Sequence, residues 1–580
     1  MLSKLRIRPK KYSLTATMIQ VMFLLFAMLI VLKLIQLQVI ESGYLSEKAR
    51  QMRQPLRTFS FRGEIVDRNG VRLAADTTLY DIYAHPKYYK DKPEKMAMLL
   101  SPYLKQPEDL LFKKLNMLDE PTIKLAKNVD RGTVIKIKKL NLRGLDLVKK
   151  NERVYPQGNL ASHIMGYVNM DANLSAGVEN TGSKDLEALP KINPIEYNGK
   201  GDVIYDNNTD PAYATSPLTG EKLTLTIDTA IQHVAEIELG KMMQKTRADR
   251  GTVIVLNPKN GEILGFAVLP SYNPSNYNKA KASIVKNWVL SDVYPPGSTF
   301  KIITIASALE TKSITKNERL MDTGKIKLKG WEITNYDYGK HGAPGLIGLK
   351  YLFMHSSNIG SLKVALKIPA EKHYNMLRLF GIGSKTGIDL PGESAGIIPP
   401  PKEWDVVKHA TIGFGYSIAS TPIQIASAVE AIANNGIWVT PHVIKYNKAE
   451  REKRIKSHKV LSPETARTMT DILSASIQDS EAQAGKIPNY RVAGKTGTSR
   501  KPNPNGPGYI PGQVFTSFAG YFPAKNPQVV IMVVVDNPKG VEMWGSTVAG
   551  PVFNNIASET ARILNIEPDA PGLNTRKKGD

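Results

Sequence analysis

Three short motifs in a fixed order constrain the fold of this chain more than any other feature of its sequence. They are Ser298-Thr299-Phe300-Lys301, Ser356-Ser357-Asn358 and Lys495-Thr496-Gly497-Thr498. The order Ser-x-x-Lys, Ser-x-Asn and Lys-Thr-Gly is typical of acyl-transfer sites in which a lysine activates a serine nucleophile. A fold that uses all three motifs must therefore bring three distant segments to one place.

The first motif is favoured over two other Ser-x-x-Lys copies by its context. Residues 294–297 read Tyr-Pro-Pro-Gly, which ends any preceding element, and residues 300–310 are mostly apolar without a breaker. Ser298 is therefore predicted to begin a helix, with Lys301 beside its hydroxyl and free N–H groups nearby. The copies at residues 283–286 and 313–316 lack this context.

The third motif also has a second copy, at residues 385–387. The copy at Lys495 precedes a Pro/Gly-rich turn region and a β-rich run at residues 514–522, which predicts an edge strand with a hairpin. The other copy follows an apolar helical stretch and precedes Pro391-Gly392, which favours a loop. Lys495 is therefore the candidate for the site.

The N-terminal sequence predicts a membrane anchor. Five basic residues within positions 1–13 precede an uncharged, largely apolar run at residues 14–32. Nineteen helical residues cover about 28 Å, enough to span a bilayer, and positive residues stay on the cytoplasmic side. A cleaved signal peptide is the alternative, but no small-x-small site follows the run. We expect a cytoplasmic tail at 1–13, a single-pass anchor at 14–40 in the cell inner (cytoplasmic) membrane, and an extracytoplasmic remainder.

Composition excludes several kinds of chemistry. The chain has no cysteine, which rules out disulfides, thiolate nucleophiles and Cys metal sites. Its nine histidines include no His-Glu-x-x-His motif, and no Gly-rich phosphate loop is present, so we expect no metal and no other cofactor. The net charge is +24, of which +19 lies outside the predicted cytoplasmic tail, and outside a cell this charge favours anionic wall polymers or lipid headgroups over nucleic acid.

Three further sequence segments, here called boxes, precede the three motifs and complete a family pattern. They are residues 62–70 (Arg-Gly-Glu-Ile-Val-Asp-Arg-Asn-Gly), 153–158 (Arg-Val-Tyr-Pro-Gln-Gly) and 177–179 (Gly-Val-Glu). With the three motifs, they closely resemble the class B high-molecular-weight penicillin-binding proteins, over nearly the whole chain. A short pedestal region, Gly413-Phe-Gly-Tyr416 and Ser517-Phe-Ala-Gly-Tyr-Phe-Pro523 look like the septal (division) branch, with the elongation branch as the nearer rival.

The resemblance implies an α/β (α+β) fold with a five-stranded antiparallel sheet between helices and a helical subdomain. We expect a mixed pedestal (dimerisation-type) domain at residues 50–220, a transpeptidase domain at 221–566 and a tail at 567–580. The pattern itself predicts a hairpin turn at Asp67-Arg68-Asn69-Gly70. It also predicts the following catalytic-domain elements: a strand at 222–227, a helix at 228–241, hairpin strands at 252–256 and 262–268, strands at 516–522 and 529–536, and a helix from Gly550-Pro551 to about 564.

Each motif residue can be assigned a role. Ser298 is the nucleophile, and Lys301 is the base if burial and a second cation, Lys495, keep it neutral. The resemblance implies an oxyanion hole from the backbone N–H groups of Ser298 and Thr498. Ser356 would return the proton to the leaving amine, and Asn358 would fix Lys301 and orient the substrate amide. Lys495, Thr496, Gly497 and Thr498 would hold the terminal carboxylate of the substrate.

The expected reaction is peptidoglycan D,D-transpeptidation, in which Ser298 is acylated by a stem peptide ending in D-Ala-D-Ala and the acyl group passes to an amine of a neighbouring stem. β-Lactams would inhibit it, and a membrane-embedded glycan polymerase and divisome proteins would be partners. The alternatives are a D,D-carboxypeptidase or β-lactamase, and a non-catalytic β-lactam sensor or scaffold. His355 beside the second motif is expected to pack rather than act as a base.

Overall fold

The computed structural model describes most of the chain. The described residues are 14–44, 60–169, 174–188, 196–197, 203–204, 218–540 and 542–575. They form two compact units, one from residues 1–61 and 188–219 and the other from residues 62–187 and 220–580. The predicted cytoplasmic tail, residues 1–13, lies outside the described residues, as do residues 576–580 of the predicted C-terminal tail.

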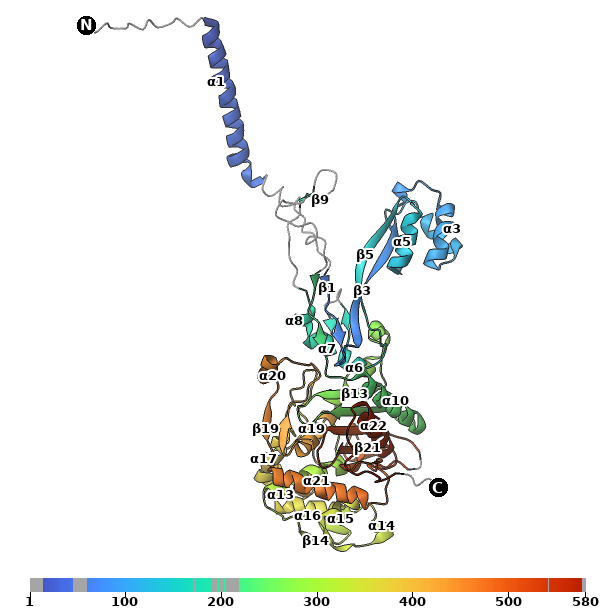
Figure 1. Cartoon of the computed structure of the whole chain (residues 1–580), viewed down its shortest axis with the longest axis vertical. Coiled ribbons are helices and arrows are strands. Elements are labelled where there is room, and N and C mark those ends of the chain that lie inside the picture. The colour runs from blue at the N-terminus through green and yellow to red at the C-terminus, as the bar shows by residue number, and fades with distance from the viewer. Residues whose placement is uncertain are drawn as a thin grey trace, which may run out of the picture. The chain divides into compact units, whose positions relative to one another are not determined.

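The first unit holds one long apolar helix (Figure 1). α1 (Leu14–Ile35) passes directly into a short π-helical segment, η1 (Gln36–Ile40), and neither contains a buried side chain. Together they span 27 residues, about 40 Å at 1.5 Å per residue, which exceeds the roughly 30 Å of a bilayer core. By length and composition, this segment suits a single membrane crossing. The unit also pairs β1 (Ser60–Phe61) with β10 (Leu218–Thr219) and β8 (Glu196–Tyr197) with β9 (Val203–Ile204).

A hairpin opens the second unit. β2 (Ile65–Val66) and β3 (Arg72–Ala84) are antiparallel, and the Asp67 side chain shapes the turn by accepting from Asn69 N and Val71 N, each at 2.8 Å. An aspartate side chain in a turn can accept hydrogen bonds from the backbone N–H groups that follow it. The predicted hairpin turn is therefore confirmed.

The long strand β3 also pairs with two later strands (Figure 1). A separate apolar core that includes Leu100, Leu111 and Ile137 fills the space between these strands and three helices. The elements are β4 (Ile123–Asp130), β5 (Leu145–Val154), α3 (Pro93–Leu104), α4 (Glu108–Leu115) and α5 (Arg131–Lys139). The shorter elements that follow are α6 (Ser162–Met165), β6 (Val168–Asn169), β7 (Leu174–Ser175), α7 (Gly177–Thr181) and α8 (Ser183–Leu186).

A buried ionic network joins these parts of the chain. Glu179 is fully buried and accepts from Arg62 Nε at 2.6 Å and from Arg153 Nε at 2.7 Å. Arg153 Nη1 also lies 3.0 Å from Asp76 Oδ1. Buried charges are tolerated only when they are paired and hydrogen-bonded in this way. The network therefore explains why arginine and glutamate occur in three separated upstream boxes.

The β2–β3 turn is bonded to the start of the next helix. Asp67 Oδ2 accepts from Thr229 N at 3.1 Å and from Thr229 Oγ1 at 2.5 Å. The helix is α10 (Thr229–Thr246), and its N-cap Asp228 accepts from Ala230 N, so the predicted helix start is confirmed. The strand predicted at 222–227 is wrong in length, because only β11 (Leu223–Thr224) pairs with β2.

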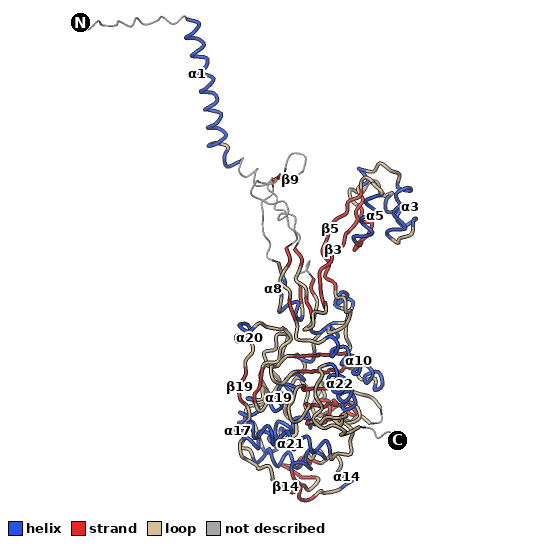
Figure 2. The backbone as a smooth tube through the Cα atoms, viewed as in Figure 1, coloured by secondary structure: helices blue, strands red, loops and turns tan. Residues whose placement is uncertain are grey.

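A five-stranded antiparallel sheet forms the centre of the C-terminal part of the chain, as predicted (Figure 2). Its spatial order is β13-β12-β22-β21-β20, which places β20 at one edge. Every residue of β22 is buried, in keeping with its run of valine, isoleucine and methionine in the middle of the sheet. The strands are β12 (Arg250–Leu256), β13 (Ile263–Leu269), β20 (Ala493–Pro502), β21 (Tyr509–Phe522) and β22 (Val529–Asp536).

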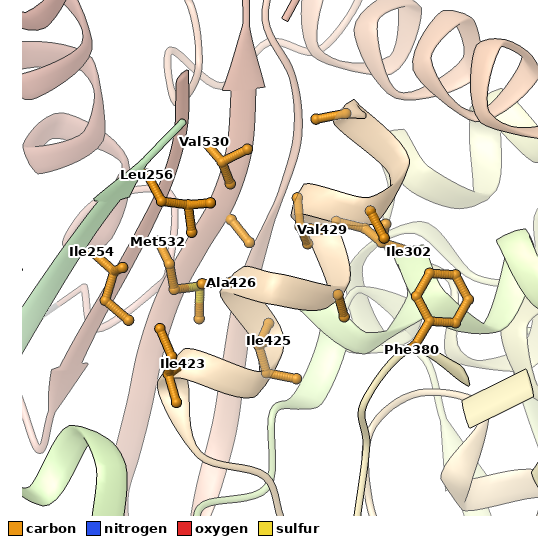
Figure 3. Close-up of a cluster of buried hydrophobic side chains, with 14 of the residues drawn as sticks. Ile254, Leu256, Ile302, Phe380, Ile423, Ile425, Ala426, Val429, Val530 and Met532 are labelled. Carbon is orange, nitrogen blue, oxygen red and sulfur yellow. The ribbon is translucent and has the colours of Figure 1, made fainter. Parts of the chain in front are cut away.

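Helices cover both faces of this sheet, because alternate residues of its strands point to opposite sides. Val253 and Val255 of β12 pack in the core shared with α10 and α22 (Ala549–Ile563). Ile254 and Leu256 pack in the core shared with α19 (Pro422–Ala433), which is buried along its whole length (Figure 3). The predicted layering of helices around the sheet is confirmed.

The stretch between the sheet strands is mainly helical, but it also contains small strand pairs that the sequence did not predict. The helices are α13 (Lys301–Glu310), α15 (Leu349–Met354), α16 (Asn358–Lys367), α17 (Ala370–Leu379), α18 (Val406–Ile412), α20 (Lys448–Arg454) and α21 (Pro463–Gln478). The strand pairs are β14 (Arg319–Asp322) with β17 (Gly345–Gly348), β15 (Lys325–Leu328) with β16 (Trp331–Thr334), and β18 (Ile437–Val439) with β19 (Ser457–Lys459). Several of these elements carry the site.

Candidate active site

Ser298 lies at the start of a helix, where the sequence predicts it. A 3-10 turn, η4 (Gly297–Phe300), runs without a break into α13. Ser298 is half-buried, and Lys301, one turn further on, is fully buried. The first motif therefore offers a hydroxyl at the surface of the site and an amine beneath it.

Lys301 joins the first motif to the second. Its Nζ donates to the carbonyl oxygen of Ser356 at 2.6 Å and to Asn358 Oδ1 at 2.8 Å, and it lies 3.2 Å from Ser356 Oγ. Ser356 has a positive φ of 54°, which turns both its carbonyl oxygen and its hydroxyl toward the amine. The Ser356 hydroxyl and the Lys301 amine are therefore close enough to exchange a proton.

The third motif lies on β20, at the outer edge of the sheet. Lys495 is buried, whereas Thr496 and Thr498 are half-buried. β20 is fastened to the chain just before the nucleophile by a hydrogen bond from Ser499 Oγ to Pro295 O at 2.7 Å. The edge strand therefore runs beside the turn that carries Ser298.

Two glycines allow close packing around this strand. A Cβ at Gly497 would lie 2.4 Å from Ser517 Oγ and 3.0 Å from Thr299 Cγ2. A Cβ at Gly545, in the segment after β22, would lie 2.4 Å from Gly497 O. In the same segment, Gly545 N donates to Thr498 Oγ1 at 3.0 Å. The threonine hydroxyl therefore keeps its own proton for another acceptor.

The two lysines differ in their electrostatic surroundings. Burial lowers the pKa of Lys301 well below its ordinary value, and the positive charge of Lys495 lowers it further, while Asp322 and Asp337 act in the opposite direction. Burial also lowers the pKa of Lys495, to about 8. Near neutral pH, Lys301 is therefore the lysine that loses its proton more readily, and Lys495 is mainly charged.

Residues outside the motifs support the site, and the sequence analysis missed them. Asp322 and Asn335 are buried and are hydrogen-bonded to the second motif, through Ser357 and through Asn358 N. No sequence signal marks them, because Asp322 ends β14 and Asn335 directly follows β16, and the two meet only in the tertiary fold.

The competing sequence candidates have structural roles. The His355 ring stacks on Tyr351 at a centroid distance of 4.1 Å, as a packing residue would. In the second Lys-Thr-Gly copy, Thr386 N and Gly387 N donate to Glu393, which closes a loop. Within the part of the chain that the structure describes, no group of three or more His, Asp or Glu side chains is arranged to hold a metal ion.

Family comparisons cover both halves of the chain. A family model of the penicillin-binding protein transpeptidase domain matches residues 251–558, and one of the penicillin-binding protein dimerisation domain matches residues 58–225. The first range contains all three motifs.

Similar proteins match this chain over most of their own lengths. Stage V sporulation protein D of Bacillus subtilis is 31% identical over 87% of this chain and 79% of its own. A peptidoglycan D,D-transpeptidase FtsI homologue of Mesostigma viride is 32% identical over 96% of this chain and 97% of its own. Penicillin-binding protein 3 of Mycobacterium tuberculosis, solved with aztreonam, has a TM-score of 0.65 at 24% identity and covers 90% of this chain and 100% of its own, which shows a shared fold. The chain thus belongs to the penicillin-binding transpeptidases, in the class B group whose transpeptidase domain follows a dimerisation domain.

Proposed function

We propose that the protein is a peptidoglycan D,D-transpeptidase that cross-links stem peptides through an acyl-enzyme on Ser298. The observation that carries this proposal is the contact of the buried Lys301 amine with Ser356 and Asn358, one helical turn from Ser298. Relatives named as peptidoglycan D,D-transpeptidases support the reaction class.

In the first step, neutral Lys301 takes the proton of Ser298 as the serine oxygen attacks the carbonyl carbon before the terminal D-Ala. The negative charge that develops on the carbonyl oxygen is held by the backbone N–H groups of Ser298 and Thr498. When the carbon–nitrogen bond breaks, Ser356 delivers a proton to the leaving amine and recovers one from Lys301. An acceptor amine then attacks the ester, and Ser298 leaves with a proton returned by the same route.

The third motif recognises the substrate carboxylate. Lys495 supplies a positive charge, and the Thr496 and Thr498 hydroxyls donate hydrogen bonds. The contact from Gly545 N supports this role for Thr498, because it occupies a lone pair and directs the hydroxyl proton elsewhere. Gly497 keeps the strand close to the nucleophile. Asn358 holds Lys301 and orients the substrate amide.

The cellular setting follows from the same family. The domain limits that we propose are an anchor at 14–40, a pedestal at 50–220, a transpeptidase domain at 221–566 and a tail at 567–580. The anchor crosses the inner membrane once, with residues 1–13 in the cytoplasm and the catalytic half outside. The FtsI-type relatives support a role in division, where the partners are a membrane-embedded glycan polymerase and divisome proteins.

The first test uses the full-length protein in detergent, and its Ser298→Ala variant, with a fluorescent penicillin. We expect one slowly hydrolysed adduct, mapped to Ser298 by mass spectrometry and absent from the variant. Rapid release of the adduct would indicate a β-lactamase, and the lack of any adduct on folded protein would contradict the acyl-enzyme.

A second test uses glycan strands whose stems end in D-Ala-D-Ala. We expect cross-linked muropeptides together with released D-Ala. Release of D-Ala without cross-links would instead indicate a carboxypeptidase, and acylation without any product would indicate a sensor.

A further inference from the structure

The second motif is hydrogen-bonded to a buried carboxylate that the mechanism above does not use. Asp322, the last residue of β14, is fully buried. Its Oδ2 accepts from Ser357 Oγ at 2.5 Å, and Asn335 Nδ2 lies 3.0 and 2.9 Å from its two oxygens. Gly324 N donates to Oδ1 at 2.8 Å. Both carboxylate oxygens of Asp322 therefore accept hydrogen bonds from neighbouring groups.

Asn335 and Ser357 carry this constraint to the start of α16. Asn335 Oδ1 accepts from Asn358 N at 2.8 Å and from Ile359 N at 3.1 Å. Ser357 Oγ accepts from Gly360 N at 2.8 Å. These are N–H groups of the first helical turn, which lack partners within the helix. Asp322 therefore orients the two side chains that satisfy the helix N-terminus.

The orientation of α16 determines what reaches Lys301. The Asn358 side chain is fixed at its amide nitrogen, which donates to Thr334 O at 3.0 Å, and its Oδ1 accepts from Lys301 Nζ at 2.8 Å. Ser356, just before the helix, contributes its carbonyl oxygen and hydroxyl to the same amine. A shift of the Asp322 network would therefore displace several of the contacts of Lys301 at once.

Asp322 also acts at Lys301 through its charge. The charged groups that influence Lys301 are Lys495 from β20, Asp322 from β14 and Asp337 from the segment before α14 (Tyr338–His341). Burial and Lys495 favour the neutral amine, and the two carboxylates favour the ammonium form. Between buried groups the effective dielectric constant is low, so such charges interact strongly. A base must also hold its proton well enough to remove one from serine.

We propose that Asp322 is a positioning residue for acylation, which holds Ser356 and Asn358 against Lys301 through Ser357 and Asn335 and counters the charge of Lys495 at the base. This proposal rests on the proposed function, because it concerns the same acylation of Ser298. It goes further by assigning two separable effects to one buried carboxylate.

Four variants of the full-length protein separate the two effects. Asp322→Asn removes the charge and disturbs the hydrogen bond to Ser357, whereas Ser357→Ala removes that hydrogen bond and keeps the charge. Asp337→Asn removes a charge that acts on Lys301 without touching Ser357 or Asn335. Glu332→Gln, at an exposed position on β16, controls for the loss of a solvent-screened charge.

The measurement is the second-order rate constant for acylation by a fluorescent penicillin, as a function of pH, together with the thermal unfolding midpoint of each variant. For Asp322→Asn we expect a loss of about tenfold at the optimum, since one charge-assisted hydrogen bond is lost. We also expect the acidic limb of its profile to move to lower pH, because removal of a nearby negative charge disfavours the Lys301 ammonium form.

The other variants should show one effect each. Ser357→Ala should lower the acylation rate constant by a similar factor and leave the acidic limb of the pH profile in place. Asp337→Asn should move the acidic limb to lower pH and lower the rate constant by less than about twofold. Glu332→Gln should change neither the rate constant nor the limb. An Asp322→Asn profile that coincides with wild type would overturn the proposal. If Asp322→Asn lowers the rate constant equally at every pH and the acidic limb does not move, the electrostatic effect on Lys301 is overturned and Asp322 acts only through its hydrogen bonds.

The experiment also distinguishes a failure of this inference from a failure of the proposed function. If wild-type protein forms no Ser298 adduct, the acyl-enzyme itself is contradicted. If wild type is acylated and the Asp322→Asn protein is folded and equally fast, Asp322 has no positioning role.

Discussion

In the proposed mechanism, Lys495 acts on both the substrate carboxylate and the base Lys301, so the loss of its proton should limit activity at high pH. Its pKa is lowered to about 8 by burial. Above that pH the lysine becomes neutral, and the attraction for the substrate carboxylate is lost together with the charge that keeps Lys301 neutral. We expect the acylation rate constant to fall by up to about tenfold per pH unit above pH 8.

The Lys495→Arg variant tests this assignment, since arginine stays charged throughout the accessible pH range. The acylation rate constant of this variant should be lower than that of wild type, because a planar guanidinium does not fit where an ammonium does. The fall of the rate constant above pH 8 should disappear. An unchanged alkaline decline in Lys495→Arg would assign it to another group.

Glu430 is a residue whose cost to stability should depend on pH. It is fully buried on α19, and neither of its carboxyl oxygens has a hydrogen-bond partner among the described residues. Burial raises the pKa of the Glu430 carboxyl group well above its ordinary value. The folded state therefore holds a proton that the unfolded state loses above about pH 4.3, so folding becomes less favourable as pH rises.

Replacement of Glu430 with Met should therefore stabilise the protein, because an apolar side chain of similar size suits the site. The gain in unfolding free energy should grow with pH by up to about 1.4 kcal/mol per unit between the two pKa values. Thermal unfolding at pH 5 and pH 8 measures it, with the exposed Glu464→Gln as control. A gain that does not change with pH would show that Glu430 is not protonated in the folded state.

At the scale of elements, the upstream sheet depends on the ionic network around Glu179. Glu179→Gln leaves Arg62 and Arg153 without their shared carboxylate, and breaking a buried ion pair in this way costs about 3–5 kcal/mol. We expect faster hydrogen–deuterium exchange in β5 (Leu145–Val154), because Arg153 belongs to this strand. The five tryptophans lie outside this region, so fluorescence would not report the change.

A matched control is Glu187→Gln, which removes a carboxylate that also pairs with Arg62 but is 63% exposed. We expect it to cost less than about 1 kcal/mol, as surface ion pairs do. Equal protection of β5 in the Glu179→Gln variant and wild type would mean that the network does not stabilise this sheet.

Elements that begin or end at characteristic capping or turn residues could be predicted from the sequence. Thr421-Pro422 begins α19, and the Thr421 capping box with Gln424 is present, because each side chain serves the other's backbone. The β12–β13 hairpin follows from Asn260-Gly261 for a similar local reason. In both cases, residues a few positions apart decide the structure.

Elements that depend on distant partners could not be predicted as well. Residues 222–227 alternate like a strand, but β11 ends at Thr224. Leu225 N still donates to Val66 O of β2, at 2.8 Å, while Leu225 also bridges to Ile444 and Thr226 Oγ1 donates to Ile263 O. Alternation reveals which side chains are buried, not which strand they join. The candidate site shows the same division: its motif residues are recognisable, whereas Asp322 and Asn335 depend on strands far from the motif they support.

For the whole molecule, the apolar helix raises the question of whether it only anchors the chain. All sides of α1 and η1 are exposed in the structure, so their full surface is available to other helices in a membrane. If this surface recruits a partner, replacement of residues 14–40 with a foreign transmembrane helix should keep membrane attachment and Ser298 acylation but lose complementation in cells. Full complementation by the chimera would limit the segment to anchoring.

The backbone packing at Gly497 and Gly545 has a consequence for evolution under antibiotic selection. A Cβ at Gly545 would lie 2.4 Å from the main-chain oxygen of Gly497, whereas a Cβ at Gly497 would lie 2.4 Å from a side-chain atom, Ser517 Oγ. Under β-lactam selection we therefore expect substitutions at Gly545 to be the less tolerated of the two, because a main-chain oxygen cannot rotate away. Changes that discriminate drug from stem peptide should arise where side chains rather than main chains meet.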